Sequence, residues 1–154
     1  MPKILFIDDD VFSQTDNGRE TTGDYMWYYQ EAIREVPGYE VMSESSTDAA
    51  LKAIQENTFD LIVLDIMMDP GECLKDNRET RGGLCTGLVL ARKIHDTHPS
   101  MKMILLSNAV APEAPQKGMA NELEAEQIVC EVFYKPKTLP FHFRDIVIDT
   151  IKGV

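Results

Sequence analysis

Four short polar motifs in the sequence could together bind and transfer a charged group. Asp8-Asp9-Asp10, Asp65, Ser107 and Lys135 each follow a short apolar run. Two carboxylates within hydrogen-bonding distance repel each other by about 4 kcal/mol at an effective dielectric of about 20. A bound Mg²⁺ offsets that repulsion, because it takes oxygen ligands and keeps waters that a phosphate can displace. Lys135 adds a point charge suited to a phosphoryl oxygen, and Ser107 adds a neutral donor.

The nucleophile available among these motifs is a carboxylate. No histidine or cysteine follows the same apolar runs. Transfer of a phosphoryl group depends on alignment and charge neutralisation more than on proton transfer. A carboxylate with a cation and a hydroxyl beside it is therefore suited to accepting a phosphoryl group.

The segments that must position these residues alternate between strand-like and helix-like patterns. Leu61 to Leu64 are four aliphatic residues with no polar face, which indicates a strand buried on both sides. The predicted strands are residues 3–7, 39–43, 60–64, 103–106 and 129–134. The predicted helices are residues 25–36, 46–57, 84–98, 120–127 and 139–152. Five strand–helix repeats indicate an α/β domain with a parallel sheet between two helical layers. The polar motifs then meet outside the carboxyl ends of the strands.

Two stretches interrupt this alternation next to the expected site. Residues 11–24 are polar, contain Gly18 and Gly23 and lack periodicity, which indicates a loop. Residues 69–85 also lack a regular pattern, and a connection of that length is uncommon inside a compact domain unless it has a function. Farther on, Pro112 and Pro115 predict an irregular segment before the helix at 120.

Length and charge limit the function classes. The 154 residues fit a single domain over 1–154, so we expect no attached output domain. The chain has 26 acidic and 15 basic residues, a net charge of −11, and no basic run, which argues against binding to nucleic acid or to an anionic membrane. It has no transmembrane-length apolar run and no signal peptide, so we expect a cytoplasmic protein. Cys73, Cys85 and Cys130 are then expected to be free thiols, with a Cys73–Cys85 disulfide or a metal site as the alternatives.

The sequence resembles the CheY-like receiver domains of two-component response regulators. The resemblance covers the chain from Lys3 to about Gly153 and rests on four motifs: residues 4–10 (ILFIDDD), 61–68 (LIVLDIMM), 104–107 (ILLS) and 134–136 (YKP). It implies a flavodoxin-like, doubly wound (βα)₅ sheet with strand order 2-1-3-4-5, here with extended loops after the first and third strands.

The resemblance also implies a role for each matching residue. Asp65 would be the phosphoacceptor, Ser107 would hydrogen-bond the phosphoryl group, and Lys135 would pair with it. Mg²⁺ would be held by oxygen atoms of Asp8, Asp9, Asp65 and the backbone carbonyl of Met67. The peptide between Lys135 and Pro136 would be cis, which is rare outside such motifs.

The same resemblance implies partners rather than a metabolic substrate. A sensor histidine kinase or phosphotransfer protein would donate the phosphoryl group from a phosphohistidine, and an unidentified downstream protein would recognise the product. The chain would not be an enzyme beyond self-catalysed phosphotransfer and dephosphorylation. It would be a monomer or a weak homodimer.

The sequence departs from the family pattern at several places. The extended loops flank the expected site. Asn108 follows the hydroxyl residue where Ala or Gly is usual, and we expect it to narrow access for the phosphodonor. Val132 replaces an aromatic residue that often takes part in the output switch.

Two alternatives stay open on the sequence alone. One is a receiver-like module that binds partners without phosphorylation. The other is a phosphatase of the haloacid dehalogenase superfamily, using Asp8 and Asp10 at the first strand and Asp145 and Asp149 as late acids. That alternative leaves Asp65 without a role.

Overall fold

The computed structural model describes residues 1–9 and 26–153. The described residues form five parallel strands in the order β2-β1-β3-β4-β5, as the sequence predicted. The strands are β1 (Lys3–Ile7), β2 (Glu40–Glu44), β3 (Leu61–Leu64), β4 (Met103–Ser107) and β5 (Glu131–Tyr134). All four residues of β3 are buried, as expected for an inner strand covered on both faces.

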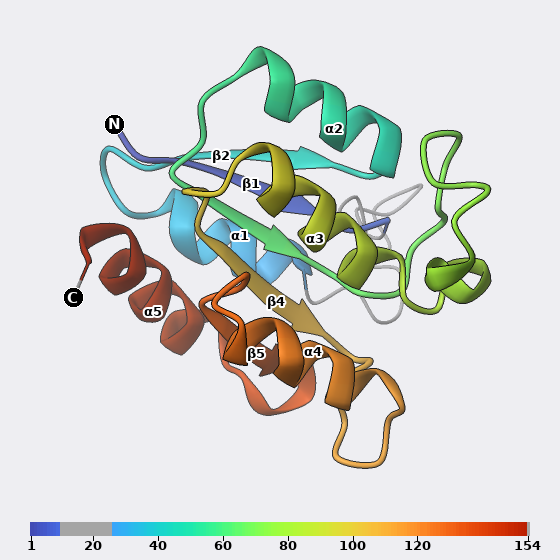
Figure 1. The fold of residues 1–154 in the computed structure, drawn as a ribbon. Coiled ribbons are helices and arrows are strands. Elements are labelled where there is room, and N and C mark those ends of the chain that lie inside the picture. Colours follow the sequence, from blue (N-terminus) through green and yellow to red (C-terminus); the bar gives the residue numbers. More distant parts are fainter. Residues whose placement is uncertain (10–25, 154) are drawn as a thin grey trace, which may run out of the picture.

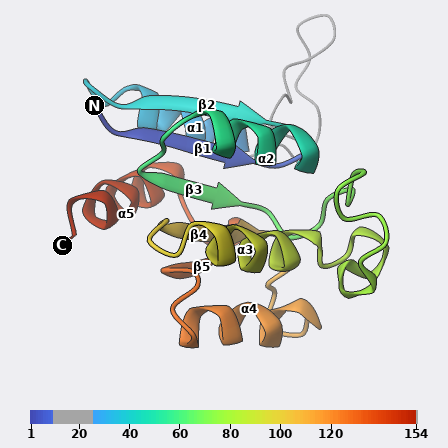
Figure 2. The same cartoon turned by 45° about the horizontal axis from the view of Figure 1, so that its top comes forward.

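Helices cover both faces of this sheet (Figure 1). The helices are α1 (Met26–Arg34), α2 (Thr47–Glu56), α3 (Thr86–Thr97), α4 (Gln116–Ala125) and α5 (Pro140–Lys152). Alternate strand residues such as Phe6 and Val63 pack in one core with Tyr29 of α1 and Phe143 of α5. The residues of opposite parity pack in a second core with α2, α3 and α4, which lie along one face of the sheet (Figure 2).

A local cap fixes the start of α2, and a close contact with the end of β3 fixes the start of α3. Ser46 caps α2 by accepting a hydrogen bond from the Ala49 amide at 3.1 Å. Gly87 lies in the first turn of α3 and has no room for a side chain, since a Cβ there would lie 1.8 Å from the Asp65 carbonyl oxygen. Its amide donates to the Ile66 carbonyl at 2.8 Å. The start of α3 is thereby held against the end of β3.

The predicted start of α4 was wrong. The sequence predicted an irregular segment up to residue 120, but α4 begins at Gln116 and ends at Ala125. Pro115 occupies the N-cap position with φ −62° and ψ −28°, values that suit the beginning of a helix. Proline lacks an amide hydrogen that the first turn does not need, so here it starts the helix and does not delay it.

The two extended loops differ in what the structure describes. Residues 10–25 lie outside the described residues, and the predicted loop at 11–24 falls among them. The segment after β3 is ordered: it includes the 3₁₀ helix η2 (Arg78–Gly83) and packs beside the carboxyl end of β3 (Figure 1). None of the helices in the described ranges is both long and apolar enough to cross a membrane.

Candidate functional site

The register of the parallel strands brings the predicted residues to one edge of the sheet. Ile7 of β1 pairs with Leu64 of β3, so the next residues, Asp8 and Asp65, follow two adjacent strands at the same level. Ser107, the last residue of β4, pairs with Tyr134, which directly precedes Lys135. Four side chains predicted from separate motifs therefore converge: Asp8, Asp65, Ser107 and Lys135. All four are buried, and Asp65 retains 8% of its surface exposed.

Lys135 joins the two carboxylates. Its Nζ donates to Asp8 Oδ2 at 2.9 Å and to Asp65 Oδ2 at 3.0 Å. Ser107 Oγ donates to the other oxygen of Asp65, Oδ1, which also accepts from the Ile66 amide at 2.7 Å. The Asp65 carboxylate is thus held by a cation on one oxygen and by neutral donors on the other.

The environment of Lys135 favours its charged form. Burial by itself lowers the pKa of this ammonium group, but the charges and hydrogen bonds of Asp65 and Asp8 together outweigh burial and raise the pKa above its ordinary value. Lys135 therefore stays positively charged beside the two carboxylates at neutral pH.

A cavity of about 470 Å³ opens onto this cluster. Its lining includes Asp9, Asp65, Met67, Ser107 and Asn108. Asp9 and Met67 are exposed, so both can reach a ligand that enters from solvent. Asn108 lies at the cavity as expected from its position, and whether it slows a phosphodonor stays a prediction.

The donor set at this edge fits a magnesium ion. Lys135 offsets part of the negative charge of the Asp8 and Asp65 carboxylates, and Asp9 adds a third carboxylate at the same edge of the sheet. All of these donors are oxygen atoms, which Mg²⁺ prefers. In the described part of the chain no three His, Cys, Asp or Glu side chains are close enough to hold a metal by themselves. A magnesium ion here would therefore need the Met67 carbonyl and water as further ligands.

Tyr29 positions Lys135, a role that the sequence did not reveal. Its buried hydroxyl lies 3.0 Å from the carbonyl oxygen of Lys135 and 2.5 Å from that of Thr138. From sequence alone, a tyrosine within the predicted helix at 25–36 is no more than a candidate core residue. No local signal could indicate its hydroxyl contact, because the partner lies 106 residues away along the chain.

The predicted cis peptide at Lys135–Pro136 was wrong. No cis peptide occurs among residues 1–9 and 26–153. Residues 135–137 instead form a single 3₁₀ turn, closed by the Thr138 amide donating to the Lys135 carbonyl at 3.0 Å. Proline fits the first turn of such a helix, and trans is the intrinsically preferred form of the bond.

The late acids of the phosphatase alternative lie on α5. Asp145 is exposed and pairs with its neighbour Arg144 at 3.1 Å, and Asp149 is exposed on the same helix. Asp10 lies outside the described residues. By contrast, Asp65 lies at the centre of the buried cluster, although the phosphatase alternative gives it no role.

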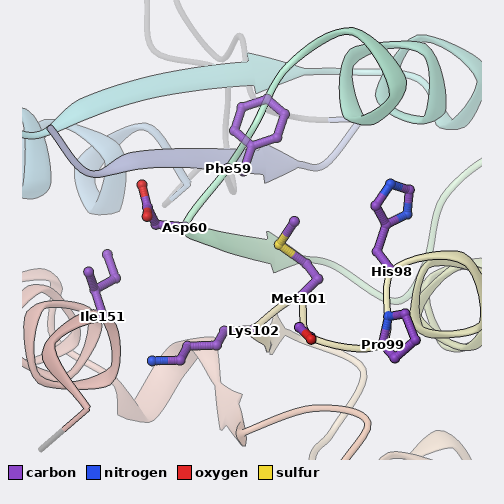
Figure 3. A pocket seen from close by; sticks show the side chains of 8 residues that line it. Phe59, Asp60, His98, Pro99, Met101, Lys102 and Ile151 are labelled. Carbon is purple, nitrogen blue, oxygen red and sulfur yellow. The ribbon is translucent and has the colours of Figure 1, made fainter.

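A second cavity, of about 450 Å³, lies at the opposite, amino end of the strands (Figure 3). Its charged groups already have partners within the chain: Lys102 Nζ donates to the Thr150 carbonyl at 2.8 Å, and Asp60 accepts from the Lys3 amide at 2.8 Å. This cavity does not gather a set of reactive groups comparable with that at the carboxyl ends.

Comparisons with known proteins identify the fold. No protein-family model matches the sequence, and no curated protein matches it. Solved structures match over the whole chain. A CheY-like receiver domain from Methanospirillum hungatei JF-1 has a TM-score of 0.68 and 18% identity, covering 99% of this chain and 95% of its own.

Two further matches are proteins from Thermotoga maritima and Vibrio cholerae. TrrA from Thermotoga maritima, solved in complex with Mg²⁺-BeF, has a TM-score of 0.63 and 21% identity over 98% of this chain and 99% of its own. The chemotaxis protein CheY4 from Vibrio cholerae has a TM-score of 0.60 and 17% identity over 100% of this chain and 98% of its own. This chain therefore has the fold of the CheY-like response regulator receiver domains.

Proposed function

We propose that this chain is a phosphoacceptor receiver that carries the phosphoryl group on Asp65. The observation that carries the proposal is the buried set around that carboxylate: Lys135 contacts Oδ2 at 3.0 Å, and Ser107 donates to Oδ1. Both groups lie where the oxygens of an arriving phosphoryl group need charge and hydrogen bonds. The cavity leaves this carboxylate accessible from one side.

In the proposed reaction, the bond between phosphorus and a histidine nitrogen of the donor breaks. A new bond forms between phosphorus and a carboxylate oxygen of Asp65. The donor ring carries a proton on its other nitrogen, so it takes up the electrons of the broken bond and leaves as neutral imidazole. Lys135 would shift its hydrogen bond from Asp65 to a phosphoryl oxygen while keeping its bond to Asp8. Ser107 would likewise turn its hydroxyl toward the phosphoryl group.

A magnesium ion would be held by Asp8, Asp9, Asp65 and the Met67 carbonyl. When bound, it would supply positive charge to the phosphoryl oxygens. The donor would be a sensor histidine kinase or a phosphotransfer protein. The added charge on Asp65 would then alter a surface that a downstream protein recognises. The receiver fold favours such a signalling role over that of a conventional enzyme.

Intact-mass spectrometry after incubation with acetyl phosphate tests this proposal. The wild-type protein should gain one phosphoryl group in the presence of Mg²⁺ and none in EDTA, and Asp65→Asn should gain none. Asp60→Asn is the matched control, because Asp60 lies at the other end of the same strand, and it should behave like wild type. A wild-type protein that gains no group would instead favour a binding module that works without phosphorylation.

A further inference from the structure

The segment between β3 and α3 is a folded lobe, residues 69–85, with hydrogen bonds of its own. At its base the Met68 amide donates to the Gly83 carbonyl at 3.1 Å, which pairs the two ends of the segment. Within it the Cys85 amide donates to the Thr80 carbonyl at 2.8 Å. Leu74 is buried against the core that contains α2 and α3. The lobe therefore has one defined position beside the sheet (Figure 2).

The first turn of α2 holds the outer part of this lobe. The carboxylate of Asp48 accepts hydrogen bonds from the amides of Glu72 and Cys73, both at 2.9 Å. Thr47 Oγ1 donates to the Asp69 carbonyl at 2.9 Å. The pKa of Asp48 is lowered by the side chain of Cys73 and by the two amides, so its ionised form is the one that binds the lobe.

Gly71 fits closely against the same carboxylate. A Cβ at this position would lie 2.9 Å from both oxygens of Asp48, and the backbone has φ +68°, which L side chains rarely adopt. The contact between Asp48 and residues 71–73, called the α2 clamp below, can therefore be disrupted independently from either side.

The two ends of the lobe form part of the wall of the acceptor cavity. Asp69 and Pro70 line it from one end of the lobe, and Gly82, Gly83 and Leu84 from the other. The remaining lining belongs to the strand ends and the residues after them, including Asp65 and Ser107. A donor that delivers a phosphoryl group to Asp65 must place its leaving group in this space.

We propose that the lobe limits the size of the leaving group that a phosphodonor places beside Asp65, and that Asp48 is the positioning residue that holds the lobe in place. The inference rests on the proposed function, because it concerns access to Asp65 as phosphoacceptor. Asp48 does not line the cavity and acts only through the lobe. Release of the α2 clamp should therefore admit larger leaving groups without changing the groups that contact the phosphoryl group.

Two acyl phosphates of different size provide the test. In each case the bond between phosphorus and the acyl oxygen breaks, a bond from phosphorus to Asp65 forms, and a carboxylate anion leaves: acetate from acetyl phosphate, or the larger benzoate from benzoyl phosphate. Initial labelling rates with Mg²⁺ are measured by intact mass. The ratio of the benzoyl to the acetyl rate is compared between proteins, which cancels intrinsic donor reactivity and the fraction of folded protein.

Two variants release the clamp and two serve as controls. Asp48→Ala and Gly71→Ala should each raise the ratio by about fivefold. Asp76→Ala removes an exposed acid of the same lobe, and Gly38→Ala adds a methyl group at another positive-φ glycine, with open space around it. Both controls should keep the wild-type ratio.

The outcomes separate the inference from the proposed function. If neither donor labels the wild-type protein, the phosphoacceptor function is wrong and the inference is lost with it. If the wild-type protein is labelled but Asp48→Ala and Gly71→Ala both keep its ratio, the size limit is wrong and the phosphoacceptor function stands. A rise in both clamp variants that is absent from both controls supports the lobe as a size limit.

Discussion

Lys135 is the residue whose removal should affect the site most. Replacing it by methionine leaves the carboxylates of Asp8 and Asp65 without their shared cation in a largely buried place. We expect Lys135→Met to lower the free energy of unfolding by about 3 kcal/mol. Adding Asp8→Asn should restore part of that loss, because it removes one of the two negative charges that Lys135 neutralised. Urea unfolding of the two single variants and the double variant measures the coupling, and additive losses would contradict the pairing.

The pKa of Lys135 also predicts a pH dependence. Burial lowers this pKa, but Asp65 and Asp8 together raise it above the ordinary value of 10.5. Because the folded-state pKa is the higher one, the stabilisation by this lysine is complete below pH 10.5 and is lost as pH rises through the folded-state pKa. The stability difference between wild type and Lys135→Met should stay constant from about pH 7 to pH 9 and narrow above 10.5. A difference that already narrows near neutral pH would contradict this assignment.

Cys73 reports on the α2 clamp without any phosphorylation. Partial burial, together with the hydrogen bond and charge of Asp48, raises the pKa of this thiol to about 11. Asp48→Ala removes the contribution of Asp48, so the rate of Cys73 alkylation should rise at a lower pH than in wild type. Peptide mass spectrometry of iodoacetamide-treated protein over a pH series measures this rate. Asp76→Ala should retain the wild-type profile, and an unchanged profile in Asp48→Ala would contradict the contact.

At the scale of elements, the junction of β3 and α3 should tolerate no added volume. Gly87 lies so close to the Asp65 and Ile66 backbone that a methyl group must displace α3 or the acceptor residue. We expect Gly87→Ala to destabilise the protein by about 3 kcal/mol. Gly118→Ala, in α4 with open space around it, should instead stabilise it by up to about 1 kcal/mol. Chemical denaturation of both variants gives the comparison, and equal effects would contradict the close approach.

The elements that the sequence predicted well are those with local determinants. The strand predicted at 60–64 depends on a run of aliphatic residues alone, and the helix predicted at 46–57 depends on local periodicity. Both are close to the observed β3 and α2. The lobe at 69–85 was predicted only as an irregular connection, because its anchor, Asp48, lies 24 residues before Glu72. The α4 start was missed because Pro115 can either interrupt a helix or begin one.

At the scale of the whole molecule, the acidic character of the chain must be separated from specific metal binding. The protein has a net charge of −11, so any salt can stabilise it by screening the repulsion between its acidic groups. Mg²⁺ at about ten times its Kd should add about 1.4 kcal/mol to the free energy of unfolding. The Tm of the protein should then be roughly 3–6 °C higher than in NaCl of equal ionic strength. Asp9→Asn should reduce this difference in Tm between Mg²⁺ and NaCl, measured by differential scanning fluorimetry. An equal difference in the variant would show that Mg²⁺ acts elsewhere.

The parallel sheet was predicted from five strand–helix repeats, and its strand order from the family resemblance that four short motifs carry. A parallel sheet also brings together the residues that follow its strands. Strand order and the convergence of Asp8, Asp65, Ser107 and Lys135 agree with that prediction. What the motifs could not reveal are contacts between distant segments, such as the Tyr29 hydroxyl on the Lys135 carbonyl. The motifs also could not predict the isomer of the Lys135–Pro136 peptide, since it depends on the turn around that bond.

The most direct test of the central claim is to locate the phosphoryl group on the chain. Protein incubated with acetyl phosphate and Mg²⁺ is reduced with borohydride, which converts a phosphorylated aspartate to homoserine, and peptide mass spectrometry identifies the altered residue. We predict homoserine at position 65 alone, and none when the phosphodonor is omitted. Homoserine at position 8, or at any other aspartate with residue 65 intact, would contradict the assignment of Asp65 as the phosphoacceptor.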